Sequence, residues 1–362
     1  MSGAARPVLL VTNHAPPFRV GAFARLHERE DLVVALIGGG VRHGGGGGGP
    51  AALPFPALQV PERAIVRLAA SGRFRAVIAG LSGRVALPGA FAGARAARVP
   101  FVLWATIWRH PRTTAHALSY LPLRGLYRHA DAIATYGPHV SDYVRAKGAR
   151  GPIVEAPQSV DDAFWAAPAQ PRRVAGFQAL FAGRDAPEKG LDVLLRAWAA
   201  SGLGEAAAAL VLAGGGSVKA HRGVHEVGRL DPPAMRNFYA GSDVVVVPSV
   251  PARDFLEPWG LIVNEAFDQG VPVIATTAVG AAAGGLVRHE QTGLVVEPGD
   301  AAGLAAALRR LHDDPALRAR LGAAARAAVR GFSHDAWAAG MSRALAAAGV
   351  SRRQPGSESL LA

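Results

Sequence analysis

The sequence predicts two α/β domains, each built on a parallel β-sheet that is covered by helices. The chain has 362 residues, which is more than a single hydrophobic core usually supports. Short apolar runs rich in β-branched residues alternate along it with longer stretches of helical periodicity. A proline- and alanine-rich segment, AAPAQPRRVAG at 166–176, separates two series of such strands.

The first series places strands near 7–12, 32–37, 75–79, 100–105, 131–135 and 152–156, and the second near 177–182, 209–213, 243–247, 272–275 and 293–296. The expected organisation is a first domain over 1–165, a linker over 166–176, a second domain over 177–335, a helix over 336–350 that crosses back to the first domain, and a disordered tail over 351–362.

Composition excludes several classes of protein. Half of the residues are hydrophobic, but runs such as Val244–Val247 are far shorter than the roughly 20 residues of a membrane span. The start of the chain lacks the pattern of a signal peptide, so we expect a cytoplasmic protein. Cysteine is absent, which excludes disulfides, thiolate metal sites and a cysteine nucleophile.

The formal net charge is +12 and lies mostly in the first half of the chain. Residues 1–165 contain 19 lysines and arginines against 9 acidic residues, whereas 166–362 contain 20 against 18. Such an excess is typical of a solvated basic face, or of a surface that meets anionic lipid, an acidic acceptor or nucleic acid. No nucleic-acid-binding motif accompanies it, so we expect no nucleic-acid partner.

The stretch ALFAGRDAPEKGLDVLLRAW opens the second domain with a strand, a tight polar loop and a helix. Apolar side chains recur on one face of that helix, at Leu191, Leu194, Leu195 and Trp198. A helix that begins at the carboxyl end of a strand favours anions. Arg184 and Lys189 place two cations there, which suits a diphosphate. The alternative is that they are surface charges paired with Asp185 and Glu188.

The stretch EPWGLIVNEA has a glutamate near each end. The expected helix covers 258–269, so Glu257 lies at its start and Glu265 roughly 10 Å further along. Both carboxylates can accept hydrogen bonds from hydroxyls, and the backbone N–H groups of Gly260 and Leu261 between them can face an anion. The alternative makes Glu257 a helix cap and Glu265 a solvated side chain, although Glu265 stands in the apolar run LIVNEAF, where an unpaired carboxylate is costly.

These motifs together resemble a known family. FAGRDAPEKGLDVLL, followed by EPWGLIVNEAFDQGVPVIAT and GLVVEPGD, is similar to the donor half of the retaining glycosyltransferases of family 4, the group 1 glycosyl transferases. The resemblance is strong over 177–335 and only topological over 1–165. It implies the GT-B fold, in which two Rossmann-like doubly wound domains face each other across a cleft.

The resemblance also implies a division of roles. Arg184 and Lys189 would bind the donor diphosphate, Glu257 would contact the transferred sugar and Glu265 the nucleotide ribose. The loop at 225–243 would line the nucleobase, with Val227, Gly228 and Leu230 nearest. The family's reaction needs no metal, and no cofactor is expected besides the nucleotide diphospho-sugar, which is a co-substrate.

The first domain offers fewer motifs. TNHAPPFRVGAFARLHE brings Asn13, His14, Arg19 and Gly21 to the first strand-to-helix loop, which related enzymes use for the acceptor and for donor phosphate. His110 and His116 follow the fourth strand. The resemblance favours His110 as a contact of the donor sugar, and the alternative is a surface histidine in an arginine-rich loop.

The predicted function is metal-independent transfer, with retention, of a sugar from a UDP- or GDP-linked donor to a glycan or lipid-linked acceptor, as in polysaccharide biosynthesis. The stretch 61–75 contains Arg63, Arg67, Arg73 and Arg75. It could lie on an anionic membrane on the cytoplasmic side, or be a surface helix whose arginines face the solvent. The alternatives are a non-catalytic sugar-nucleotide or glycan-binding protein and a GT-B sugar-nucleotide epimerase.

Overall fold

A computed structural model describes residues 6–38, 53–110, 112, 114–214 and 221–351 of the chain. The tail expected to be disordered therefore lies outside the described residues, apart from Ser351. The described chain divides into two compact units. The first unit consists of Met1–Trp108, Thr114–Ser159 and His334–Ala362, and the second of Arg109–Thr113 and Val160–Ser333.

The first unit contains a seven-stranded parallel sheet in the part of the chain that the structure describes, with the order β3-β2-β1-β4-β5-β6-β7. Its strands are β1 (Val8–Thr12), β2 (Leu32–Leu36), β3 (Ala57–Gln59), β4 (Ala76–Gly80), β5 (Phe101–Ala105), β6 (Ala132–Thr135) and β7 (Ile153–Glu155). The central strands are fully buried. This explains their continuous apolar sequences, since both faces of such a sheet are covered by helices.

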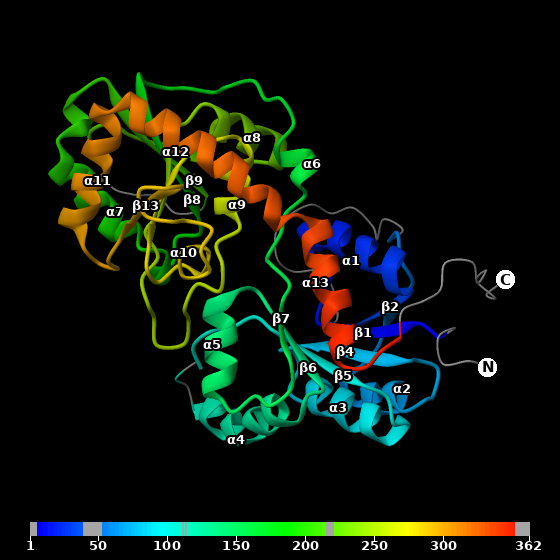
Figure 1. Ribbon diagram of the computed structural model, residues 1–362. Helices are drawn as coiled ribbons and strands as arrows, with labels where there is room; N and C mark the ends of the chain where they lie inside the picture. The colour runs from blue at the N-terminus through cyan, green and yellow to red at the C-terminus, as the bar shows by residue number, and fades with distance from the viewer. Residues whose placement is uncertain (1–5, 39–52, 111, 113, 215–220, 352–362) are drawn as a thin grey trace. The chain divides into compact units, whose positions relative to one another are not determined.

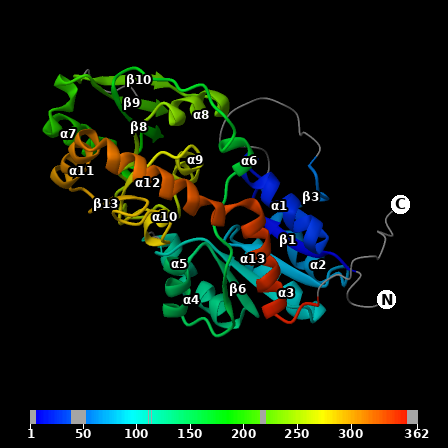
Figure 2. The same cartoon turned by 45° about the horizontal axis from the view of Figure 1, so that its top comes forward.

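The helices of the first unit lie on both faces of this sheet. They are α1 (Pro17–Glu30), the 3₁₀ turn η2 (Glu62–Ala64), α2 (Ile65–Ala69), α3 (Ala86–Ala97), α4 (Thr114–His129), α5 (Pro138–Ala146) and α13 (His334–Ala347). Figure 1 shows α1 and α13 on one face and α2 and α3 on the other, and the turned view of Figure 2 agrees.

The last helix completes the core of the first unit. Trp337 of α13 is fully buried, and its ring centre lies 5.6 Å from that of Phe23 on α1 and 5.4 Å from that of Trp104 on β5. A methyl group on Gly21 would come within 2.4 Å of the His334 ring. Helices α1 and α13 therefore approach closely because residue 21 has no side chain.

The second unit contains a six-stranded parallel sheet among the described residues, with the order β10-β9-β8-β11-β12-β13. Its strands are β8 (Phe177–Gly183), β9 (Ala208–Gly214), β10 (Val224–Gly228), β11 (Val244–Val247), β12 (Val273–Thr276) and β13 (Gly293–Val296). The prediction of two parallel α/β units is thus confirmed.

The strands β3 and β10 were not predicted. Both lie at the edge of a sheet, and most of their residues are exposed. Neither has a continuous apolar run: β3 has the sequence ALQ and β10 the sequence VHEVG. The edge strand β13, with the sequence GLVV, does have one and was predicted. The stretch 225–243, expected as a loop, is in fact most of β10 followed by helix α8.

The helices of the second unit also cover both faces of their sheet. They are α6 (Asp162–Trp165), η3 (Pro187–Lys189), α7 (Leu191–Ser201), η4 (Leu203–Glu205), α8 (Pro232–Ala240), α9 (Ile262–Asp268), α10 (Gly280–Ala283), α11 (Ala301–Asp313), α12 (Pro315–Ala328) and η5 (Val329–Phe332). Helices α7 and α11 lie on one face, and α8 and α9 on the other (Figures 1 and 2). As predicted, Leu191, Leu194 and Trp198 of α7 are buried in the core.

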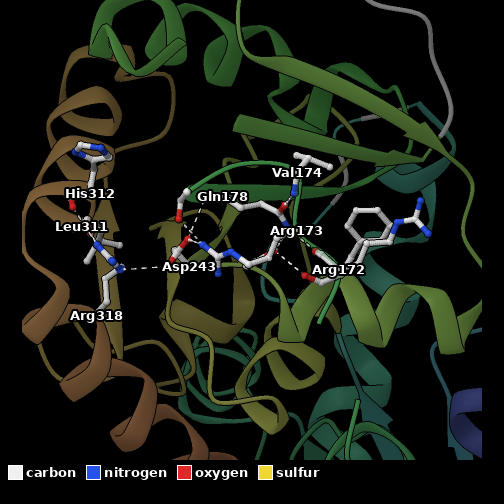
Figure 3. Close-up of polar contacts among 11 residues, drawn as sticks. Arg172, Arg173, Val174, Gln178, Asp243, Leu311, His312 and Arg318 are labelled. Atoms are coloured by element: carbon white, nitrogen blue, oxygen red, sulfur yellow. Dashed lines mark hydrogen bonds and ion pairs between the residues drawn. The ribbon is translucent and has the colours of Figure 1, made fainter. Parts of the chain in front are cut away.

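A polar network joins the segment before β8 to the amino ends of β8 and β11 (Figure 3). Asp243 accepts hydrogen bonds from the Arg173 guanidinium at 2.5 Å and from the Gln178 N–H at 2.8 Å, and its other carboxylate oxygen lies 3.4 Å from the Arg318 side chain. The Gln178 side-chain oxygen in turn accepts from the Val174 N–H. These bonds fix the segment around Arg173 to the second unit.

The stretch 61–75 does not form one amphipathic helix. It is divided into η2 and the short helix α2, which ends at Ala69. Arg63, Arg67 and Arg73 are exposed, but Arg75 is buried and forms an ion pair of 2.6 Å with the buried Glu30. The expectation that Arg75 belongs to a basic surface is therefore wrong, because its charge is used inside the unit.

Candidate functional site

The second sheet changes direction between β8 and β11. From β8 the chain builds outward through β9 to β10, and it then returns to the other side of β8 to build β11, β12 and β13. In parallel α/β sheets, ligands bind beyond the carboxyl ends of the strands at such a switch point. The loops that follow β8 and β11 therefore form the candidate site.

These two loops pack tightly against each other. Gly190, at the end of the β8 loop, has φ of +69°, and a methyl group on it would come within 2.0 Å of the Pro248 carbonyl oxygen in the β11 loop. The Val250 N–H also donates to the Glu188 carbonyl at 3.0 Å. The glycine of the motif EKG is thus required by the close approach of the two backbones.

Lys189 and Glu257 meet at this point. The Lys189 ammonium donates a hydrogen bond to the Glu257 carboxylate, and it also lies 5.7 Å from the centre of the Phe255 ring. The side chains are 23% and 10% exposed, respectively. Lys189 and Glu257 are 68 positions apart in the sequence and were both expected to bind the same ligand. They are in contact because the loops after β8 and β11 meet at the switch point.

The backbone around Glu257 is held in place by the segment after β12. Glu257 pairs with Val279 in a parallel bridge, and the Gly280 N–H donates to the Glu257 carbonyl at 3.1 Å. A methyl group on Gly280 would come within 1.9 Å of the Pro258 carbonyl. The glycine allows this approach, which fixes the position from which the Glu257 side chain extends.

Arg184 is placed differently. Its side chain is 72% exposed and forms an ion pair of 3.2 Å with Glu188, four residues later. This matches part of the alternative in which the loop cations pair with their neighbours. The Glu188 side chain is only 17% exposed, but the guanidinium itself lies in water, where an ion pair is weak. The guanidinium can therefore exchange Glu188 for an anionic ligand at little cost.

The helix expected at 258–269 begins later than predicted. Helix α9 starts at Ile262, because Gly260 has φ of +92°, a conformation outside the helical region. Glu265 therefore lies in the first turn of α9, and Gly260 and Leu261 lie in the turn before it. The estimate of two helical turns between Glu257 and Glu265 is wrong.

Glu265 is half-buried and has a partner that the sequence did not reveal. The Tyr239 hydroxyl on α8 donates to its carboxylate at 2.7 Å. Burial raises the pKa of Glu265 to about 7, against a smaller lowering by the Tyr239 hydrogen bond. Burial also raises the pKa of Asp268 on the same helix to about 7, helped by the negative charges of Asp162 and Glu265. Tyr239 was missed because it lies 26 residues from Glu265 in the sequence.

His110 lies in a short segment that belongs to the second unit. The guanidinium of the preceding Arg109 donates to the carbonyls of Ala252 and Phe255, the latter at 2.6 Å. The Arg112 N–H donates to the Arg253 carbonyl at 3.0 Å. The segment is thus attached to the loop that leads to Glu257. His116 lies on α4, at a position where the structure describes only the backbone.

The residues expected near the nucleobase lie at the edge of the second sheet. Val227 and Gly228 are the last two residues of β10, and Leu230 follows them. Gly228 has φ of +67°, and the register with β9 shifts between Glu226 and Gly228. All three residues are therefore at the carboxyl end of the sheet, on the side of β8 opposite to β11.

The first unit has a cavity at its own switch point, between β1 and β4. Its volume is about 240 Å³. The lining residues with polar side-chain atoms include Asn13, His14, Arg19, Ser82, Trp104, Thr106, Tyr136 and Gln158. Three of the four predicted acceptor-side residues, Asn13, His14 and Arg19, line it, whereas Gly21 packs against His334 instead.

Two of these lining residues, Tyr136 and Gln158, were not predicted. Tyr136 directly follows β6, so its place at the carboxyl end of a strand could have indicated it. Gln158 is the third residue after β7 and carries no such signal.

The described residues show neither a metal cluster nor a membrane-spanning helix. No group of three or more histidine, aspartate or glutamate side chains there could hold a metal ion. No helix in the same part of the chain has the length and apolar character needed to cross a bilayer.

Comparison with solved structures first defines the fold. Anabaena Alr3699/HepE in complex with UDP aligns with a TM-score of 0.71 at 17% identity, over 94% of this chain and 99% of that chain. The same protein has also been crystallised with UDP-glucose. Together with the two parallel sheets, this likeness confirms the GT-B fold.

Comparison of sequences gives matches that include much of the second unit. Residues 176–314 match the family "Glycosyl transferases group 1", which confirms the predicted resemblance over that segment. A Mycobacterium tuberculosis glycogen synthase is 30% identical over 214 residues, which are 56% of this chain and 50% of that protein. A Thermomonospora curvata D-inositol 3-phosphate glycosyltransferase is 36% identical over 182 residues, 43% of this chain and 39% of that protein. The aligned part thus spans half or less of these relatives.

Proposed function

We propose that this chain is a glycosyltransferase of family 4 that transfers a sugar from a nucleotide diphospho-sugar to a glycan or lipid-linked acceptor. The observation that supports it most directly is the contact between Lys189 and Glu257 at the switch point of the sheet that matches the group 1 family. The cation that would bind the diphosphate and the carboxylate that would bind the sugar hydroxyls are thus adjacent. This is required because the diphosphate and the sugar are directly joined in the donor.

The donor is expected to be held at three points. The Lys189 ammonium and the Arg184 guanidinium bind the diphosphate. The Glu257 carboxylate accepts hydrogen bonds from hydroxyls of the transferred sugar, and the Glu265 carboxylate from those of the ribose. His110 contacts the donor sugar, in keeping with the attachment of its segment to the loop before Glu257.

The chemical step proceeds with retention. The acceptor hydroxyl oxygen attacks the anomeric carbon on the face from which the leaving group departs, the bond from that carbon to the diphosphate oxygen breaks, and a diphosphate oxygen takes the proton of the hydroxyl. Lys189 and Arg184 stabilise the negative charge that develops on the leaving diphosphate. These cations stabilise the leaving diphosphate as a metal ion does in other transferases. The reaction is therefore metal-independent and persists in EDTA.

Substitution of the two cations tests this assignment. We expect Lys189→Ala and Arg184→Ala to abolish transfer while circular dichroism shows an intact fold. Arg196→Ala is the matched control, because Arg196 lies on α7 in the same unit, is 61% exposed and pairs with Asp192. Full activity in both cation variants, or an equal loss in the control, contradicts the site.

Thermal shifts identify the class of donor. A ligand at 100 times its dissociation constant stabilises a protein by about 2.7 kcal/mol, so UDP, GDP, ADP, TDP and their common sugars can be compared by melting temperature. The crystallised complexes of Anabaena Alr3699/HepE favour UDP. One series should stabilise the protein and lose its effect in Glu265→Ala. Stabilisation by a nucleotide sugar without turnover on any acceptor instead supports a binding protein.

The exposed arginines Arg63, Arg67 and Arg73 of the first unit support a peripheral contact with an anionic membrane, which would bring the protein to a lipid-linked acceptor. Each basic residue near such a surface contributes about 1 kcal/mol. We expect vesicles rich in anionic lipid to bind the protein at low salt and to lose most of it when all three arginines are changed to Gln. Equal binding of neutral vesicles contradicts this contact.

A further inference from the structure

The cavity of the first unit contains a buried cation that the protein satisfies only in part. Arg19, on the first turn of α1, is 4% exposed. One guanidinium nitrogen, Nη2, donates to the Tyr136 hydroxyl at 2.6 Å and to the Gln158 side-chain oxygen. The other, Nη1, has no hydrogen-bond partner among the described residues. A buried guanidinium N–H without an acceptor is costly.

None of the described residues that line the cavity is acidic, so no carboxylate among them compensates this charge. Aromatic rings take that place: the guanidinium carbon lies 4.9 Å from the centre of the Trp104 ring and 5.4 Å from that of Tyr136, distances that permit cation–π attraction. Burial lowers the pKa of Arg19 below its usual value, as expected for a cation removed from water without a counter-ion.

A second buried arginine of the same unit, Arg75, has a purely structural role and can be compared with Arg19. Arg75 is 6% exposed. Its guanidinium pairs with the Glu30 carboxylate at 2.6 Å and donates to the carbonyls of Arg6 and Glu30, both at 2.8 Å. Buried charges in proteins are normally paired in this way. The absence of such a carboxylate beside Arg19 therefore requires a different explanation.

The remaining lining suits a small polar molecule. Asn13, His14, Ser82 and Thr106 supply side chains that can hydrogen-bond to hydroxyls, and Phe18, Phe23 and Trp104 supply apolar walls. The volume of about 240 Å³ corresponds to about eight waters at about 30 Å³ each. This is room for one small ring and its substituents.

We infer that this cavity binds the acceptor through an anionic group, a carboxylate or a phosphate, that forms a charge-assisted hydrogen bond with Nη1 of Arg19. The inference rests on the proposed function, because it takes the molecule in the cavity to be the acceptor. It narrows that function to acceptors that carry a negative charge. A charge-assisted bond is about twice as strong as a neutral one, so the anionic group contributes much of the affinity.

Equilibrium binding without any donor tests the inference. Isothermal titration calorimetry compares glucose with glucuronate, which tests a carboxylate, and with glucose 6-phosphate, which tests a phosphate. We expect at least one of the anionic sugars to bind the wild-type protein at least tenfold more tightly than glucose. In Arg19→Met, which keeps the length of the side chain and removes its charge, we expect this preference to disappear.

Two further variants control the experiment. Arg25→Met removes a positive charge from the same helix at a side chain that is 50% exposed, and it should keep the preference. Thr106→Trp leaves Arg19 in place and fills the cavity, so it should lose binding of the anionic sugar even if Arg19→Met does not fold. The melting temperature of each variant reports whether it is folded.

Three results overturn the inference. The first is equal affinity of the wild-type protein for glucose and both anionic sugars, and the second is a preference for the anionic sugar that persists in Arg19→Met or Thr106→Trp. The third is an Arg19→Met variant that loses affinity for UDP or GDP but keeps its affinity for the sugars. The last result would make Arg19 a contact of the donor diphosphate. If the proposed function is wrong, the outcome is different. Lys189→Ala then leaves nucleotide binding and turnover unchanged, whether or not the anionic sugars bind.

Discussion

The two ends of the six-stranded sheet both hold charged clusters, but the clusters are built differently. At the amino end, Asp243 is 14% exposed on its side chain, and Arg173, Arg318 and a backbone N–H surround it. At the carboxyl end, Arg184 is largely exposed, and Glu257 is the carboxylate partner of Lys189 among the described residues. The first arrangement saturates its acceptors within the protein, whereas the second leaves donors that a ligand can use. Charge alone therefore does not identify a site.

The largest difference between the two ends should appear in catalysis. Glu257→Gln keeps an oxygen that can accept from Lys189 but removes the charge, so we expect the free energy of unfolding to change by less than about 1 kcal/mol. Transfer should fall about 100- to 1000-fold, as when one group that stabilises a transition state is removed. Steady-state kinetics with a donor found by thermal shift measure this. A loss of stability with normal kcat would make Glu257 structural, like Asp243.

The opposite pattern is expected at the amino end. Asp243→Ala removes the counter-charge of Arg173 and Arg318 and the acceptor of the Gln178 N–H, although both guanidinium groups keep backbone carbonyl acceptors. We expect a cost of about 3 kcal/mol of the free energy of unfolding. Activity per folded molecule should not change. Urea denaturation and the kinetics of the folded fraction check this together. Normal stability would show that the network is dispensable, and a loss of kcat would show that the two ends are coupled.

The buried carboxyls near the site should make stability depend on pH. The pKa values of Glu265 and Asp268 are raised to about 7 by burial, so the folded protein binds protons more tightly than the unfolded chain. The contribution of these groups is then largest below their usual pKa values and is lost as the pH rises to about 7. We expect the free energy of unfolding to be larger at pH 5 than at pH 8, by on the order of 1–3 kcal/mol for each group. The melting temperature, which measures this, should be higher at pH 5.

Nucleotide affinity should change in the opposite direction. The ribose hydroxyls donate to an ionised carboxylate, so the affinity for the nucleotide should increase between pH 6 and pH 8. Glu265→Gln should flatten both dependences, and Asp268→Asn only the dependence of stability. An affinity that is independent of pH, or unaltered by Glu265→Gln, would remove Glu265 from the ribose site.

The smallest effect is expected at the exposed pair of the carboxyl end. Glu188→Ala removes the partner of Arg184, and because exposed ion pairs contribute about 0–1 kcal/mol, stability should barely change. The affinity for the nucleoside diphosphate should be kept or modestly increased, since Arg184 no longer has a competing anion. Thermal shift with the diphosphate measures this. Reduced affinity would show that Glu188 positions Arg184 for the ligand.

Much of the fold was predictable because its central strands are buried on both faces. Continuous apolar runs such as VVVV at Val244–Val247 lie in the middle of each sheet, and they were recognised. The edge strands β3 and β10 and the late start of α9 at Ile262 were not. Their local sequences lack a distinctive pattern, and the conformation of Gly260 is set by its neighbours.

The sequence by itself determined the two parallel sheets, the motifs with Arg184, Lys189, Glu257 and Glu265, and the family that they indicate. These properties depend on local periodicity and on short spacings. Only the tertiary structure decided that Lys189 contacts Glu257 and that Tyr239 donates to Glu265. It also decided that Arg75 has a carboxylate partner, whereas no described residue lining the cavity of Arg19 is acidic. Each of these depends on how distant segments pack, and packing determines which charges are buried and which remain available to a ligand.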